Sequence, residues 1–109
     1  MKSLSSILLE SLNKLNKNNL FIEVCKKGSI KIVKLLIDKG ADVNAKNNDG
    51  WTALIWASRN GYTEIAKLLI DKGADVNAKN NYVWTALMLA SRNGYKKVVE
   101  LLKQYGAKE

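Results

Sequence analysis

The residues of this chain that could do chemistry are few. The 109 residues include no histidine and a single cysteine, Cys25. Histidine is the side chain that most often acts as a general base or metal ligand near neutral pH. Cys25 therefore has no histidine to activate it as a nucleophile and no second cysteine with which to hold zinc. We interpret Cys25 as a small buried hydrophobic residue and predict that the protein holds no metal.

The acidic residues and glycines offer no catalytic arrangement either. Asp38 and Asp42 recur 33 residues later as Asp71 and Asp75, so each is explained by its place in a repeat. A phosphate-binding loop needs several glycines close together. The glycines of this chain all stand singly. We therefore predict that the protein is not an enzyme and uses no cofactor.

The same period of 33 residues organises most of the chain. The nine residues GADVNAKNN occur at 40–48 and again at 73–81. The same step carries Gly28 to Gly61 and then to Gly94. A fixed period of this length is the signature of a stacked repeat array. We divide the chain into an N-terminal segment and three units, with the bounds 1–17, 18–50, 51–83 and 84–109.

Each unit is predicted to contain two antiparallel helices and an extended loop. In the second unit, Thr52 is a suitable N-cap and Gly61 a suitable end for the first helix. A second helix follows with one apolar face, made of Ile65, Leu68 and Leu69. The polar, asparagine-rich residues 74–83 have the composition of a turn. We expect Leu68 to lie at the centre of the core.

Units of this kind resemble ankyrin repeats. The resemblance covers residues 18–109 and rests on the helix starts Thr52-Ala53-Leu54-Ile55 and Thr85-Ala86-Leu87-Met88 and on the closing GADVNA. It implies an all-α repeat solenoid of stacked helix–turn–helix units joined by β-hairpin loops. Both helix starts lack the proline and histidine of the family's T-P-L-H, and the first unit is degenerate, reading Asn19-Leu20-Phe21.

Both ends of the chain have the pattern of caps. Residues 1–17 are predicted to form an amphipathic helix whose apolar stripe is Leu4, Ile7, Leu8, Leu12 and Leu15. We expect this capping helix to cover the first unit, because terminal units must be shielded. Membrane or partner binding is the alternative. In the third, C-capping unit Lys103 stands where the earlier units have Ile37 and Ile70.

The resemblance implies that binding residues lie on the hairpin tips and on the inner-helix ends that face a concave groove. Stepping by the period also aligns Lys26 with Arg59 and Arg92, a row of cations. The candidate contacts are Lys26, Lys46, Asp49, Trp51, Arg59, Asn60, Lys79, Tyr82, Trp84, Arg92 and Asn93. For Trp51 and Trp84 structural packing is the alternative, and for the cations ordinary solvation. Trp56 aligns with Leu89 and is expected in the core.

These residues predict a protein–protein interaction module that binds an acidic or aromatic segment of another protein. The net charge of +8 keeps one alternative open, a basic accessory protein with weak electrostatic binding to nucleic acid. No apolar run approaches the ~20 residues that span a bilayer, so we expect no membrane segment. The single cysteine favours a reducing, cytoplasmic compartment. We expect a monomer.

One hairpin tip is expected to depart from the repeat. The first tip ends in Asp49-Gly50, where glycine takes a positive φ at low cost. Its counterpart is Tyr82-Val83, and a β-branched residue with positive φ is an outlier. We therefore predict a remodelled second tip, with Val83 at negative φ and Tyr82 displayed toward the groove.

Overall fold

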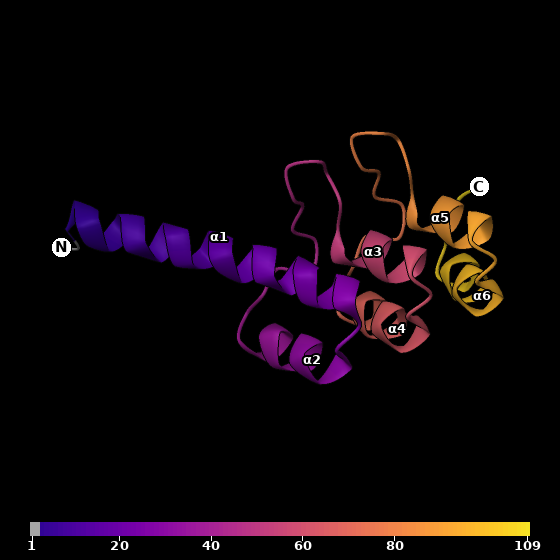
Figure 1. Ribbon diagram of the computed structural model, residues 1–109, viewed down its shortest axis with the longest axis horizontal. Helices are drawn as coiled ribbons and strands as arrows, with labels where there is room; N and C mark the ends of the chain where they lie inside the picture. Colours follow the sequence, from indigo (N-terminus) through magenta and orange to yellow (C-terminus); the bar gives the residue numbers. More distant parts are fainter. Residues whose placement is uncertain (1–2) are drawn as a thin grey trace.

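The protein is an all-α repeat solenoid (Figure 1). A computed structural model describes residues 3–109, apart from the side chains of residues 11–16. Its helices are α1 (Leu4–Lys27), α2 (Ile30–Asp38), α3 (Ala53–Arg59), α4 (Thr63–Asp71), α5 (Ala86–Arg92) and α6 (Lys96–Gln104). The fold class predicted from the sequence is confirmed.

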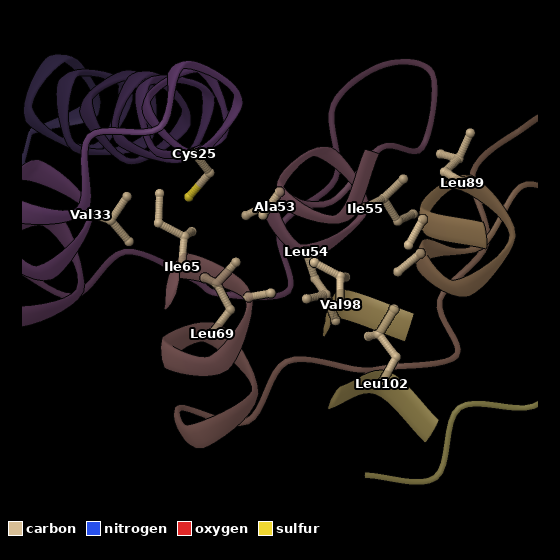
Figure 2. Close-up of a cluster of buried hydrophobic side chains, with 14 of the residues drawn as sticks. Cys25, Val33, Ala53, Leu54, Ile55, Ile65, Leu69, Leu89, Val98 and Leu102 are labelled. Carbon is tan, nitrogen blue, oxygen red and sulfur yellow. The ribbon is translucent and has the colours of Figure 1, made fainter. Parts of the chain in front are cut away.

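The helices form two layers. The inner layer is α1, α3 and α5, packed side by side in that order, and the outer layer is α2, α4 and α6. Apolar side chains from both layers meet in one continuous core, which Figure 2 shows around Leu54, Ile65 and Leu69. The Cys25 side chain lies in this core and is fully buried, as predicted.

Threonine caps and single glycines mark the turns of each unit. Thr52 accepts a hydrogen bond at its Oγ1 from the backbone N–H of Ile55, 3.2 Å away, which confirms it as the N-cap of α3. Gly61 ends the connection after α3 with φ of 76°. A Cβ atom there would lie 2.7 Å from the ring of Tyr95 in the next unit, so the close approach of two units also requires glycine.

The repeated phrase GADVNA joins each unit to the next through its asparagine. The Asn44 side chain donates from Nδ2 to the carbonyl oxygen of Gly73 (3.0 Å) and accepts at Oδ1 from the N–H of Asp75 (2.7 Å). Asn77 makes the same two bonds to Gly106 and Lys108, at 3.2 and 2.8 Å. These side chains satisfy backbone groups of the neighbouring phrase, which gives a physical reason for its repetition.

The two loops between units have the same hydrogen bonds at their tips. In the first, the Asn47 Oδ1 accepts from the N–H groups of Asp49 and Trp51, at 2.9 and 3.0 Å. The Asn47 backbone oxygen also accepts from Gly50 (3.0 Å), and its N–H donates to Trp51 (3.0 Å). One asparagine therefore closes the whole tip.

The second tip is not remodelled, so the prediction for Val83 was wrong. Val83 has φ of 67°, close to the 80° of Gly50. Asn80 makes the same bonds as its counterpart, accepting at Oδ1 from Tyr82 (2.9 Å) and Trp84 (3.0 Å) and at its backbone oxygen from Val83 (3.0 Å). These local bonds outweigh the strain of a positive φ at a β-branched residue, which is of order 1–3 kcal/mol.

The N-terminal segment also differs from the expected capping helix. Helix α1 runs unbroken from Leu4 to Lys27, because this stretch contains neither proline nor glycine. Its first turns project beyond the body (Figure 1), and the side chains of Leu4, Ile7 and Leu8 are exposed. The predicted stripe residues Leu12 and Leu15 lie outside the described side chains. The described part of the stripe therefore does not cover the first unit.

The centre of the middle unit is Leu69 and not Leu68. The Leu69 side chain is fully buried. Leu68 is half-buried and lines a hollow of 220 Å³ between α2 and α4, together with Lys34, Ile37 and Asp38. The two leucines are adjacent on one helix, about 100° apart around its axis, so only one can point straight at the inner layer.

Candidate functional site

One tryptophan of the inner layer lies between two cations. The ammonium Nζ of Lys26, at the end of α1, is 4.6 Å from the centroid of the Trp56 ring. The guanidinium carbon of Arg59, one turn further along α3, is 5.4 Å from the same ring. Both distances fall within the ~6 Å at which a cation is attracted to an aromatic face.

Trp56 also stacks on the tryptophan that precedes its helix. The ring centroids of Trp51 and Trp56 are 4.1 Å apart and the planes are inclined by 23°. The loop tip holds Trp51 in place, because its N–H is bonded to Asn47. Trp56 is half-buried, so the expectation that it belongs to the core was wrong. One signal was available in the sequence: Trp56 precedes Arg59 by three residues, so both lie on one helix face.

The third unit repeats only part of this arrangement. The Arg92 guanidinium carbon lies 5.3 Å from the Trp84 ring centroid. Leu89 replaces the second tryptophan of the pair and is buried. The structure therefore presents two clusters of cation and tryptophan, one in each of two neighbouring units.

Two candidate contact residues serve the positions of the cations. The Asn60 side chain donates from Nδ2 to the carbonyl oxygen of Lys26 (2.9 Å). The Asn93 side chain donates in the same way to the carbonyl oxygen of Arg59 (2.7 Å). Each asparagine thus ties its own unit to the backbone of the cation in the preceding unit, and these bonds set the register of the cationic row.

The remaining candidates lie on the two loop tips. The Lys46 ammonium group donates to the carbonyl oxygen of Lys79 (3.4 Å), and the N–H of Asn81 donates to the carbonyl oxygen of Asp49 (2.9 Å). The loops are therefore hydrogen-bonded to each other. The side chains of Lys46, Lys79, Asp49 and Tyr82 are exposed, and that of Tyr82 is 64% accessible.

The charges of this surface are available to an incoming anion. Within the described part of the chain, neither Arg59 nor Arg92 forms an ion pair with a carboxylate. The carboxylate of Glu109 instead bonds Lys103 at the end of the chain, 2.6 Å away, which lowers the pKa of Glu109. Cations that lie on aromatic faces without a carboxylate partner favour an acidic ligand with flat groups.

The one thiol of the chain is poorly suited to chemistry. Burial raises the pKa of Cys25 from 9.0 to about 12, so the neutral thiol predominates at neutral pH and the nucleophilic thiolate does not form. Within residues 3–109, no group of three metal-ligating side chains was found. No described helix combines the length and the hydropathy that a membrane span requires.

Comparisons with known proteins agree with this architecture. The family model described as ankyrin repeats matches the chain in three copies, over residues 2–80 and 20–109. A protein of Acanthamoeba polyphaga mimivirus, named as an ankyrin repeat protein, is similar to this chain, with 50% identity over 42 residues. That similarity covers 38% of this chain and 7% of the mimivirus protein, so the chain spans a small part of that relative's length.

Proposed function

Since the chain belongs to the ankyrin-repeat family, we propose that it binds an acidic, aromatic segment of another protein on its cation–tryptophan surface. Ankyrin repeats are generally protein–protein interaction modules and are typically non-catalytic. The observation that carries the proposal is the Trp56 ring held between Lys26 and Arg59 and stacked on Trp51. Tryptophan and arginine are the residue types in which binding energy concentrates at protein interfaces.

The two kinds of side chain divide the work of binding. The cationic row of Lys26, Arg59 and Arg92 attracts an acidic segment and raises its association rate, an effect that weakens with salt. The exposed parts of the tryptophan rings supply apolar contact, which governs how long the complex lasts. Asp49 is the one acid among the candidate contacts, and its exposed position at a loop tip suits a basic residue at the edge of the partner segment.

The buried Cys25 thiol supports a non-catalytic role and a reducing compartment such as the cytoplasm. A thiol kept in the core serves packing rather than disulfide formation.

A random copolymer of glutamate and tyrosine tests the proposal, because it presents acidic and aromatic groups without a fixed sequence. Binding is measured by tryptophan fluorescence and by anisotropy of the labelled copolymer. Arg59→Glu with Arg92→Glu is expected to weaken binding at least about tenfold, which corresponds to about 1.4 kcal/mol. Folding should be nearly unchanged, because both side chains are exposed.

The matched control reverses the same amount of charge elsewhere. Lys67→Glu with Lys97→Glu alters exposed lysines of α4 and α6 and should weaken binding no more than about twofold, since their distance allows screening by salt. Equal losses in both double variants would show that net charge alone drives binding. A second arm uses oligothymidylate. If this probe binds more tightly than the copolymer and through Trp56, the surface recognises single-stranded nucleic acid instead.

A further inference from the structure

The first unit leaves its outward end uncovered. Leu20, Ile32 and Leu35 are 53%, 45% and 53% exposed. Their equivalents one unit later are Ala53, Ile65 and Leu68, of which Ala53 and Ile65 are at most 2% exposed because the preceding unit packs on them. We call Leu20, Ile32 and Leu35 the N-face. It has the composition of a buried interface between units, and in a monomer it faces water.

A second unpartnered apolar surface lies on the projecting part of α1. We call residues 4–16 the arm; its described leucines and isoleucine include Leu4, Ile7 and Leu8, which are 77%, 47% and 59% exposed. The arm extends beyond the body of the molecule in Figure 1. Burial of such side chains stabilises a complex by about 25 cal/mol per Å² of apolar surface.

The arm of a molecule cannot cover its own N-face. Leu8 and Leu20 lie on the same continuous helix, about 18 Å apart along its axis at 1.5 Å per residue. The base of the arm is also held, because Lys17 donates from Nζ to the carbonyl oxygen of Lys39 (2.9 Å) and Asn18 accepts at Oδ1 from the N–H of Asp42 (3.2 Å). Both surfaces therefore need a partner from outside the molecule.

The opposite end of the array is not a suitable partner for the N-face. At the junction of the first two units, Ile37 lines a hollow with Leu68. In a head-to-tail contact between two molecules, Lys103 would take the place of Ile37 and Leu35 that of Leu68. Lys103 would then have to leave water and its ion pair with Glu109 to meet an apolar side chain.

We propose that the N-face binds the arm of a second copy of this chain, in a symmetric dimer in which each arm covers the partner's N-face. The two surfaces occur on every copy, so one two-fold axis pairs both at once and leaves no open end. Each copy carries a net charge of +8, so the copies repel each other over long range. Salt screens this repulsion and therefore strengthens the dimer, whereas it weakens the binding of an acidic segment. The proposal differs from the monomer expected from the sequence.

Sedimentation equilibrium of the full chain tests the dimer, at protein concentrations up to about 100 μM and at about 0.15 M and 0.5 M salt. The expected result is a monomer–dimer equilibrium that shifts toward the dimer at the higher salt. Leu35→Glu in the N-face and Leu8→Glu in the arm should each raise the dissociation constant at least about tenfold. Both substitutions lower the net charge of each copy, so repulsion cannot explain such a loss. Circular dichroism checks that both variants remain folded.

The control is Met88→Glu, which places the same charge on an exposed apolar residue at the opposite end of the array. Its dimer should be as stable as that of the unaltered chain. The proposal is overturned if the unaltered chain remains a monomer under all conditions, or if Leu8→Glu leaves the dimer intact. It is also overturned if Met88→Glu weakens association as much as Leu35→Glu, since that result indicates a head-to-tail contact.

Discussion

The indole rings of Trp51 and Trp56 stack with their centroids 4.1 Å apart, although one residue ends a loop and the other lies inside helix α3. Trp56→Leu removes one ring of this stack and the cation-binding face between Lys26 and Arg59. We expect the variant to release the glutamate–tyrosine copolymer at least about tenfold faster, with a smaller change in association rate. Leucine is tolerated at the equivalent position of the third unit, Leu89, so folding should persist. Surface plasmon resonance measures both rates, and an unchanged dissociation rate would remove Trp56 from the binding surface.

Asn44 is expected to stabilise the junction between the first two units. Asn44→Ala removes the bonds to Gly73 and Asp75 and should cost about 1–3 kcal/mol, at 0.5–1.5 kcal/mol for each bond. Urea denaturation followed by circular dichroism measures the loss. Asn48→Ala is the control, because the Asn48 side chain is exposed and makes no bond among the described residues. An equal effect of the two substitutions would contradict this role for Asn44.

Val83 is a point of strain, and its replacement should stabilise the protein. Val83→Gly relieves the cost of a positive φ at a β-branched residue. After the entropy cost of glycine is deducted, we expect a gain of about 1 kcal/mol. The urea midpoint measures this gain. The converse substitution, Gly50→Val, should destabilise the protein, because a Cβ atom at Gly50 would lie 2.6 Å from the Asn81 side chain. A loss of stability in Val83→Gly would mean that the valine makes a contact worth more than its strain.

Leu69 and Leu68 should differ in their contribution to stability. Leu69→Ala leaves a cavity at the centre of the middle unit and should cost about 2–5 kcal/mol. Leu68→Ala truncates a half-buried side chain beside a surface hollow, so its cost should be smaller by at least about 1 kcal/mol. Denaturant titration of the two variants under the same conditions decides the order. The reverse order would place the core at Leu68, as expected from the sequence.

The buried thiol of Cys25 should make the protein less stable at high pH. In the folded state its pKa is raised from 9.0 to about 12, so between these values the unfolded chain loses its thiol proton while the folded chain keeps it. The stability due to the neutral thiol is complete below pH 9.0 and is lost as pH rises toward about 12. Cys25→Ser, the residue of the other two units, lacks this titration. The stability of the unaltered chain relative to this variant should fall between about pH 8 and pH 10.5 in urea titrations. A constant difference would mean that the thiol is reached by water.

Properties that depend on local bonding and on the repeat could be predicted from the sequence. The period of 33 residues predicts stacked units, because neither helix of a unit can bury its apolar face alone. Thr52 caps α3 as expected, since an N-cap bonds the residue three places later. The burial of Cys25 follows in the same way from its register with Ser58, which is also fully buried. The family comparison supports the same architecture.

The remaining features were decided by contacts between residues far apart in the chain. The position of Trp56 depends on Trp51 and on Lys26 of the preceding unit, so its alignment with Leu89 alone pointed to the core. The φ of Val83 depends on bonds to Asn80 that outweigh the local preference of valine. The arm projects because α1 continues into the first unit without a break, whereas its apolar stripe alone would equally fit a separate cap. In each case the tertiary structure selects one of several conformations that the local sequence allows, because packing and hydrogen bonds between units contribute more free energy than local preference does.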